Sequence, residues 1–204
     1  MKRRDSLRRR GPTRSPKLRF LIVCEGQVTE PRYFSRLRHL LRSLVELEIL
    51  PGGDPKKLVE RAVQKKSEAD AAASRKKDSY LTYDKVWCVC DVDEHPRLND
   101  ALQQARDNGI DVALSNPCFE LWALLHFQDQ TAHIERGVVQ HLCRKHMPGY
   151  IKELPCETLL ERHSEAAERA VKLDQLHESR EAPGGNPSTG VYRLVAEIKS
   201  QSQF

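Results

Sequence analysis

Apolar runs that alternate with helix-patterned segments constrain the fold of this 204-residue chain more than any other feature. The segments 17–24 and 84–90 both end in continuous apolar runs, which are typical of central strands covered on both faces. The segments 45–49 and 110–114 have the pattern of two further strands. Because strands and helices alternate along the chain, we predict an α/β fold with a mostly parallel four-stranded sheet flanked by helices.

The segments between these strands carry the caps and apolar stripes of helices. Thr29 and Asp54 are placed to cap the first two helices, and Ser188 or Thr189 is placed to cap the last one. In a charged helix near the carboxyl end we expect Val171 to face inward with the other apolar residues. The expected helices cover residues 29–44, 56–77, 98–108, 119–127, 157–181 and 189–198.

Charge is concentrated at the amino terminus. Residues 1–19 contain nine Lys and Arg against Asp5 alone, whereas the whole chain has a formal net charge of +5. An arm of this composition repels itself and has little to bury, so we expect it to be disordered. Its basic residues can neutralise nucleic-acid phosphates, but a solubilising tail explains them equally well. The candidate nucleic-acid contacts are Arg8, Arg9 and Arg10.

We divide the chain into a basic arm at 1–16, an α/β core at 17–127 and a helical carboxyl-terminal extension at 128–204 that packs on the core. No apolar run approaches the roughly 20 residues of a membrane helix. The six cysteines lie mostly in apolar segments, as free buried thiols do. These features predict a cytoplasmic protein that does not act at a membrane.

Acidic residues directly follow two of the predicted central strands. Glu25 follows the first, and Asp91 and Asp93 follow the third. Ligands of open parallel sheets bind beyond the carboxyl ends of strands, so we expect these carboxylates to converge. An all-oxygen cluster suits a hard cation such as Mg²⁺ or Mn²⁺, which would polarise a phosphodiester. Ordinary turn residues are the alternative, but their placement at two strand ends favours metal binding.

Other polar residues are weaker candidates. Glu30 would be a further metal ligand, or would only complement a helix dipole. The candidates for residues that contact the substrate or support the metal ligands are Gly26, His95, Asn116, Glu120, Asn186 and Ser188. For His95 the alternative is a solvated loop residue, and for Asn116, Glu120, Asn186 and Ser188 it is ordinary helix capping.

Four sequence blocks resemble the RloB-like family, and they occur in the family's order over about residues 18–200. The first block contains Cys24, Glu25, Gly26, Gln27, Val28, Thr29, Glu30 and Pro31. The second is Asp91, Val92, Asp93, Glu94 and His95. The third and fourth are Ser115-Asn116-Pro117-Cys118-Phe119-Glu120-Leu121-Trp122 and Asn186-Pro187-Ser188-Thr189. Each block is short, and their shared order makes the match specific.

The resemblance implies a Toprim-like core, in which Glu25, Asp91 and Asp93 bind divalent metal. It also implies a bacterial or archaeal anti-phage role, since RloB-like proteins are associated with restriction–modification and abortive-infection loci. A partner from the same locus, an ATPase or a restriction–modification protein, would fit that role, and self-association stays open. With no topoisomerase or primase module in the chain, the implied activity is a nuclease.

Glu25, Asp91 and Asp93 would then form the catalytic group, with Glu25 as metal ligand and general base. Whether the substrate is DNA or an RNA such as tRNA stays open. A different class of function is a non-catalytic module that binds nucleic acid or senses a phage product. A third is an enzyme that acts on a small nucleotide.

Overall fold

The structure is a computed structural model of the 204-residue chain. It describes residues 17–42, 45–51, 53–92, 97–180, 182 and 184–201. Several predicted residues lie outside these ranges: Arg8, Arg9 and Arg10 of the basic arm, and Asp93 and His95 of the second block.

The core is one five-stranded sheet with the strand order β2-β1-β3-β4-β5. Its strands are β1 (Arg19–Cys24), β2 (Glu46–Pro51), β3 (Lys85–Asp91), β4 (Asp111–Asn116) and β5 (Ser188–Thr189). The first four strands are parallel, and β5 pairs antiparallel with β4. The predicted α/β class and mostly parallel sheet are therefore confirmed, with one short strand added from the carboxyl-terminal part.

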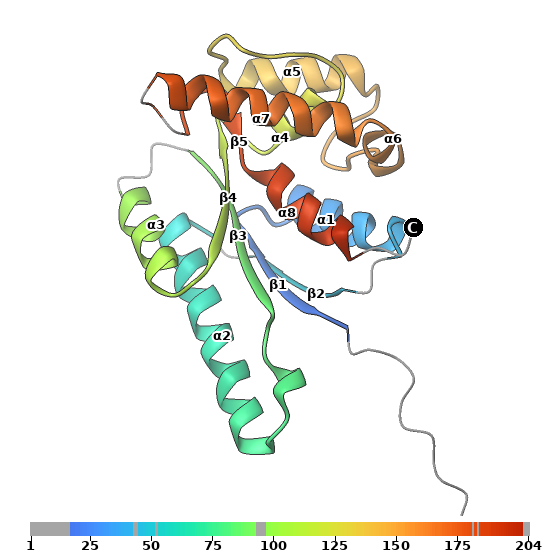
Figure 1. The fold of residues 1–204 in the computed structure, drawn as a ribbon. Coiled ribbons are helices and arrows are strands. Elements are labelled where there is room, and N and C mark those ends of the chain that lie inside the picture. Colours follow the sequence, from blue (N-terminus) through green and yellow to red (C-terminus); the bar gives the residue numbers. More distant parts are fainter. Residues whose placement is uncertain are drawn as a thin grey trace, which may run out of the picture.

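Helices cover both faces of the sheet and its carboxyl edge (Figure 1). Helices α2 and α3 lie on one face, and α1 and α8 lie on the other, whereas α4, α5, α6 and α7 gather beyond the carboxyl ends of the strands. Their bounds are α1 (Thr29–Leu40), α2 (Pro55–Lys76), α3 (Leu98–Asp107), α4 (Glu120–Leu125), α5 (Arg136–His146), α6 (Cys156–Glu161), α7 (His163–Ser179) and α8 (Val191–Ser200), with a 3-10 turn η1 (Ser79–Leu81). No helix in the described ranges is long and apolar enough to span a membrane.

Alternation along the strands separates two hydrophobic cores. On β1, Phe20 and Ile22 pack in the larger core with α1, α8 and the helices beyond the sheet. Leu21 and Val23 point the opposite way, into a smaller core with α2 and α3. Both faces of β1 are thus dry, which explains why its sequence is continuously apolar. The six cysteines are buried free thiols, as the sequence indicated.

The end of the chain differs from the prediction. Ser188 and Thr189 form β5, and Gly190 is the residue that precedes α8. The Oγ atom of Ser115 and the Oγ1 atom of Thr189 lie 2.9 Å apart, and Gly190 N donates to the Leu114 carbonyl at 2.8 Å. Partners on β4 therefore satisfy these polar groups, and only Thr189 retains a long contact of 3.4 Å with the α8 amide of Val191.

The predicted helix over 157–181 is two helices, α6 and α7, which meet at Arg162. The expectation that Val171 faces inward is wrong, because its side chain is 36% exposed. Helix α7 buries small side chains, Ala166 and Ala170, against the core, with Leu173 one turn further on. The face of α7 that packs on the core is therefore narrower than the apolar residues of its sequence suggested.

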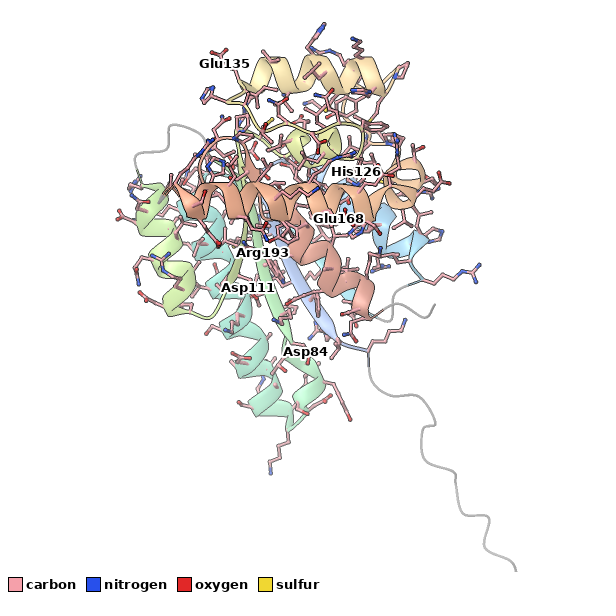
Figure 2. The ribbon with its side chains drawn as sticks, turned by 45° about the horizontal axis from the view of Figure 1, so that its top comes forward. Asp84, Asp111, His126, Glu135, Glu168 and Arg193 are labelled. Carbon is pink, nitrogen blue, oxygen red and sulfur yellow. The ribbon has the colours of Figure 1, made fainter. Side chains whose placement is uncertain are left out.

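Two buried histidines join α4 to α7. His126 directly follows α4 and is labelled in Figure 2, and His163 begins α7. Both rings face the ring of Trp122, at centroid distances of 4.6 and 5.8 Å. His126 Nδ1 donates to the Trp122 carbonyl at 2.8 Å, and Trp122 Nε1 donates to the Tyr33 hydroxyl at 2.8 Å. The Nε2 atoms of both histidines are buried without a hydrogen-bond partner among the described residues. Burial lowers the pKa of each to about 4.

We predict that acid destabilises the fold through this pair. Both folded-state pKa values lie below the ordinary value of 6.5, so the unfolded chain binds more protons at mildly acidic pH. Their contribution to stability is complete above about pH 6.5 and is lost as the pH falls toward 4. Urea unfolding of wild type and His126→Leu across this window will show a smaller loss in the variant. Exposed His141 on α5 supplies the control, because His141→Leu should leave the loss unchanged.

Candidate functional site

The parallel pairing of β1 with β3 brings two predicted acids together. Glu25 extends β1, and its amide donates to the Val89 carbonyl at 2.9 Å. The Glu25 carboxylate then accepts the amide of Asp91 at 3.0 Å through Oε2. Asp91 is the last residue of β3 and is 9% exposed. The structure therefore places Glu25 and Asp91 side by side at the carboxyl edge of the sheet.

Gly26 lets a third carboxylate approach this edge. Glu30 lies in the first turn of α1 and is buried. A Cβ atom at Gly26 would lie 2.0 Å from Glu30 Oε2 and 2.5 Å from Oε1, so a side chain there and the Glu30 carboxylate exclude each other. The glycine that follows Glu25 is thus the condition for Glu30 to fold back over the strand end.

These residues line a cavity of about 410 Å³, here called the acidic cavity. Its lining residues are Glu25, Gly26, Gln27, Val28, Thr29, Glu30, Asp91, Arg136 and Lys152. The loop after β1, the start of α1 and the end of β3 supply the acids, and the carboxyl-terminal part supplies two cations. The cavity thus combines three carboxylates with one guanidinium and one ammonium group.

Arg136 is the cation that contacts the acids directly. It begins α5, and its Nη2 atom donates to Asp91 Oδ2 at 3.1 Å and to the Pro117 carbonyl at 3.4 Å. Sequence reasoning missed Arg136 and Lys152 because the segment from Gln128 onward has no clear periodic pattern. Their positive charge was the only local signal, and many surface residues share it.

Burial and neighbouring carboxylates both disfavour ionisation of Asp91 and Glu30 in the cavity. The pKa of Asp91 is raised to about 8, chiefly by burial; Arg136 acts to lower it, and Glu30, Glu25 and Glu120 act to raise it. Burial also raises the pKa of Glu30, with further contributions from Glu120 and Glu25, although its own amide and that of Gly26 act in the opposite direction. Carboxyl groups in such a site favour either a proton or a cation.

The donor set of Glu25, Glu30 and Asp91 fits a divalent metal in its chemistry. Carboxylate oxygens are the ligands that Mg²⁺ and Mn²⁺ prefer. As placed, no group of three or more His, Cys, Asp or Glu side chains in the described ranges forms a ready metal site, and Asp93 lies outside those ranges. The arrangement supplies suitable oxygens, one of which is held by Arg136.

Glu120 lies next to the acidic cavity and does not line it. It sits in the first turn of α4, and its Oε1 atom accepts from the Tyr150 hydroxyl at 3.2 Å and from Gln140 Nε2 at 3.5 Å. Its charge acts on Asp91 and Glu30, as the pKa shifts show. Glu120 therefore adds to the negative electrostatic potential at Asp91 and Glu30 without lining the cavity.

The other predicted polar residues connect the strands to the carboxyl-terminal part. The Asn186 amide pairs with both backbone groups of Ile134 at 2.9 Å, and Asn116 Nδ2 donates to the Gly184 carbonyl at 3.0 Å. Buried Ser188 stands opposite Asn116 in the β4–β5 pair. None of these three lines the acidic cavity. Asn186 affects the cavity indirectly, because it fixes the backbone two residues before Arg136.

We predict that Gly26→Ala displaces Glu30 without unfolding the protein. The atoms that a Cβ would meet are the end of a flexible side chain, so the loss of stability should stay below the about 1–3 kcal/mol of overpacking in a rigid core. Glu30 would move toward solvent, and its raised pKa would fall toward the ordinary value of 4.5. NMR titration of the Glu30 carboxyl carbon measures this change.

Gly137→Ala is the matched control, because nothing lies within 4 Å of a Cβ at Gly137. It should leave the Glu30 titration unchanged. An unaltered Glu30 pKa in Gly26→Ala would show that the close approach of the carboxylate does not set its burial.

Comparison with known proteins adds one finding to this geometry. A family model described as RloB-like protein matches residues 20–198, which include all four sequence blocks and both cations of the acidic cavity. No curated protein and no solved structure gives a significant match. Because the family match covers most of the chain, the protein belongs to the RloB-like family.

Proposed function

We propose that this protein is a metal-dependent nuclease that hydrolyses phosphodiester bonds of nucleic acid in the acidic cavity. The observation that carries the proposal is the burial of Asp91 beside Glu25 and Glu30 at the carboxyl edge of the sheet. Placing carboxylates this close has a cost, which a bound cation would offset. The resemblance to Toprim-like proteins supports the same activity.

Glu25, Glu30 and Asp91 would hold Mg²⁺ or Mn²⁺, together with Asp93. When bound, such an ion polarises a phosphodiester and favours ionisation of an attacking water. Glu25 is the candidate general base, and its carboxylate would take the proton of that water. Asp91 needs no movement of the backbone for this role, because Glu25 already fixes its amide.

Arg136 and Lys152 would position the substrate. A guanidinium group matches two phosphate oxygens at once, and an ammonium group adds a compact point charge. Arg136 is now paired with Asp91, and a phosphate in the cavity would compete for it. The same arginine would thus neutralise the site when it is empty and hold the scissile phosphate when it is occupied.

An anti-phage role in bacteria or archaea is part of the proposal, and it rests on the family resemblance alone. So does a partner from the same locus, an ATPase or a restriction–modification protein. DNA and RNA remain equal candidates as substrate, because the charged residues that line the described part of the acidic cavity would act on a phosphate, which both polymers share.

One observation favours a second candidate, a non-catalytic module that binds nucleic acid or senses a phage product. Arg136 Nη2 lies 3.1 Å from Asp91 Oδ2, so this carboxyl group has a partner without any metal. A permanent ion pair of this kind would stabilise the contact between β3 and α5 and would serve no catalytic purpose.

We predict that the purified protein cleaves nucleic acid with Mg²⁺ or Mn²⁺, and that Glu25→Gln and Asp91→Asn each lower the rate by roughly 100-fold or more. Both substitutions remove a charge with little change in shape. Cleavage of mixed DNA and RNA substrates measures the effect and identifies the polymer. Asp111→Asn is the control, since exposed Asp111 begins β4 at the opposite end of the sheet (Figure 2).

Binding of nucleic acid without cleavage under any divalent ion would replace this proposal with the sensing module. Hydrolysis of mononucleotides in preference to polymers would indicate the small-nucleotide enzyme. Equal activity of Asp91→Asn and wild type, with the fold retained, would remove the acidic cavity from the mechanism.

A further inference from the structure

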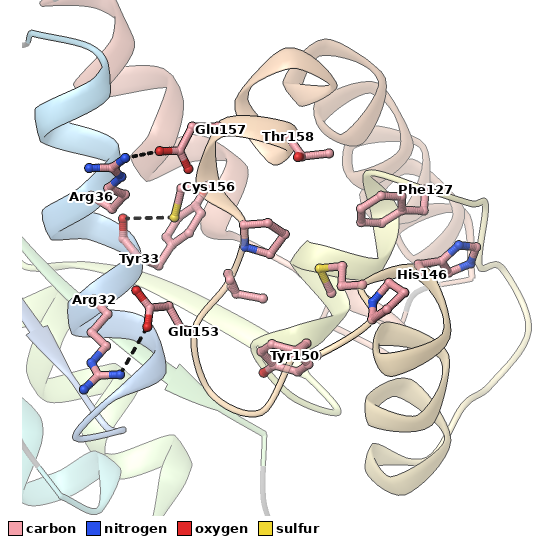
Figure 3. A pocket seen from close by; sticks show the side chains of 15 residues that line it. Arg32, Tyr33, Arg36, Phe127, His146, Tyr150, Glu153, Cys156, Glu157 and Thr158 are labelled. Atoms are coloured by element: carbon pink, nitrogen blue, oxygen red, sulfur yellow. Dashed lines mark hydrogen bonds and ion pairs between the residues drawn. The ribbon is translucent and has the colours of Figure 1, made fainter.

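A second cavity of about 610 Å³ lies beside α1 and is here called the aromatic cavity (Figure 3). Its walls come from α1, from Phe127 after α4, from the end of α5 and from the segment 147–158. Its rings and cations are Tyr33, Phe127, His146, Tyr150, Arg32 and Arg36. This size and mixture of rings with a few charged groups are typical of sites that bind small organic groups.

We propose that the aromatic cavity holds one unstacked nucleotide of the nucleic-acid strand that is cleaved in the acidic cavity. The base would lie against the rings, and a neighbouring phosphate would lie on Arg32 and Arg36. The inference rests on the proposed function and states how that site takes its substrate: as a single strand, or as a strand with one base out of the stack.

The two cavities share a wall. Glu30 lines the acidic cavity, and Arg32, two residues further along α1, lines the aromatic cavity. In the same way, Lys152 lines the acidic cavity and its neighbour Glu153 lines the aromatic cavity. Tyr150 stands between them, in the aromatic cavity with its hydroxyl on Glu120. Because the two cavities adjoin, a strand with one phosphate in the acidic cavity would place an adjacent nucleotide at the aromatic cavity.

The rings are held in place before any ligand arrives. Phe127 and His146 stack in parallel, with centroids 5.2 Å apart and an interplanar angle of 8°. His146 Nε2 lies 2.9 Å from Gln128 Oε1, which fixes the ring, and Arg162 lies over Phe127 at 5.4 Å. Fixed rings lose little conformational entropy on binding, and every base offers a face for stacking.

The arginines at the rim of the aromatic cavity form exposed ion pairs that a phosphate could displace. Arg32 pairs with Glu153 at 3.6 Å, and Arg36 pairs with Glu157. All four side chains are at least half exposed, and ion pairs this exposed hold weakly. A phosphate is a stronger partner for a guanidinium, so it can replace either glutamate. The glutamates then become the groups that oppose binding.

The first test uses short single-stranded DNA and RNA oligonucleotides on the full chain with Asp91→Asn, so that binding is measured without cleavage. Fluorescence anisotropy gives the dissociation constant, and 2-aminopurine in the strand reports an unstacked base. His146→Ala should weaken binding at least about fivefold, the lower end of what a stacked ring contributes. His141→Ala, on the same helix and outside the cavity, should not.

The second test concerns charge. Arg32→Gln with Arg36→Gln should lower the slope of log binding constant against log salt by about 0.7, the contribution of the one phosphate of a single strand that the two arginines would hold. Arg75→Gln with Lys76→Gln removes the same charge from the exposed end of α2 and should leave the slope unchanged. Glu153→Gln with Glu157→Gln should tighten binding. Thermal melts matched to the parent will confirm that each variant is folded.

Equal weakening by the α1 and α2 double variants would mean that only net charge matters and would overturn the proposal. Binding that His146→Ala leaves unchanged would also overturn it, as would no binding at all, or binding of free mononucleotides but not of oligonucleotides. These outcomes are separate from those of the proposed function. If the protein binds through His146 but never cleaves, the nucleotide site is supported and the nuclease proposal is rejected. If it cleaves but His146→Ala leaves binding unchanged, only the nuclease proposal is supported.

Discussion

The parallel pairing of β1 with β3 is the constraint on which the rest of the molecule depends. Because two adjacent strands run the same way, whatever follows them lies at one edge of the sheet. That edge places the amide of Asp91 on the Glu25 carboxylate at 3.0 Å. The apolar residues that hold β1 and β3 between two cores therefore also hold two acids at contact distance, and fold stability and site geometry have the same source.

The carboxyl-terminal part completes what the sheet begins. It supplies the cations of the acidic cavity and covers the edge at which the carboxylates lie. Burial under this helical layer is what raises the pKa of Asp91, since desolvation is its largest cause. The helical layer thus has two opposing effects on the pKa of Asp91. It removes water, which raises the pKa, and it supplies Arg136, which lowers it. A site balanced in this way responds strongly to any charge that enters it.

The sequence allowed the sheet and its acids to be predicted because those signals are local. Apolar runs identify buried strands, and Glu25 and Asp91 follow such runs directly. Strand β5 could not be predicted, because two residues, Ser188 and Thr189, have no periodicity and pair only through hydroxyl and backbone contacts with β4. Arg136 was missed for a related reason: its contact with Asp91 spans 45 positions, and no pattern near Arg136 records it.

Asn186 has a consequence for the order in which the site is made. Its amide holds both backbone groups of Ile134, two residues before Arg136, yet it comes late in a chain that is synthesised from the amino end. The acids of β1 and β3 leave the ribosome long before this clamp exists. The growing chain thus carries the carboxylates first and gains the clamp beside Arg136 only after Asn186 has been added. A polypeptide that stops before Asn186 would hold the acids without this clamp on the segment that precedes the arginine.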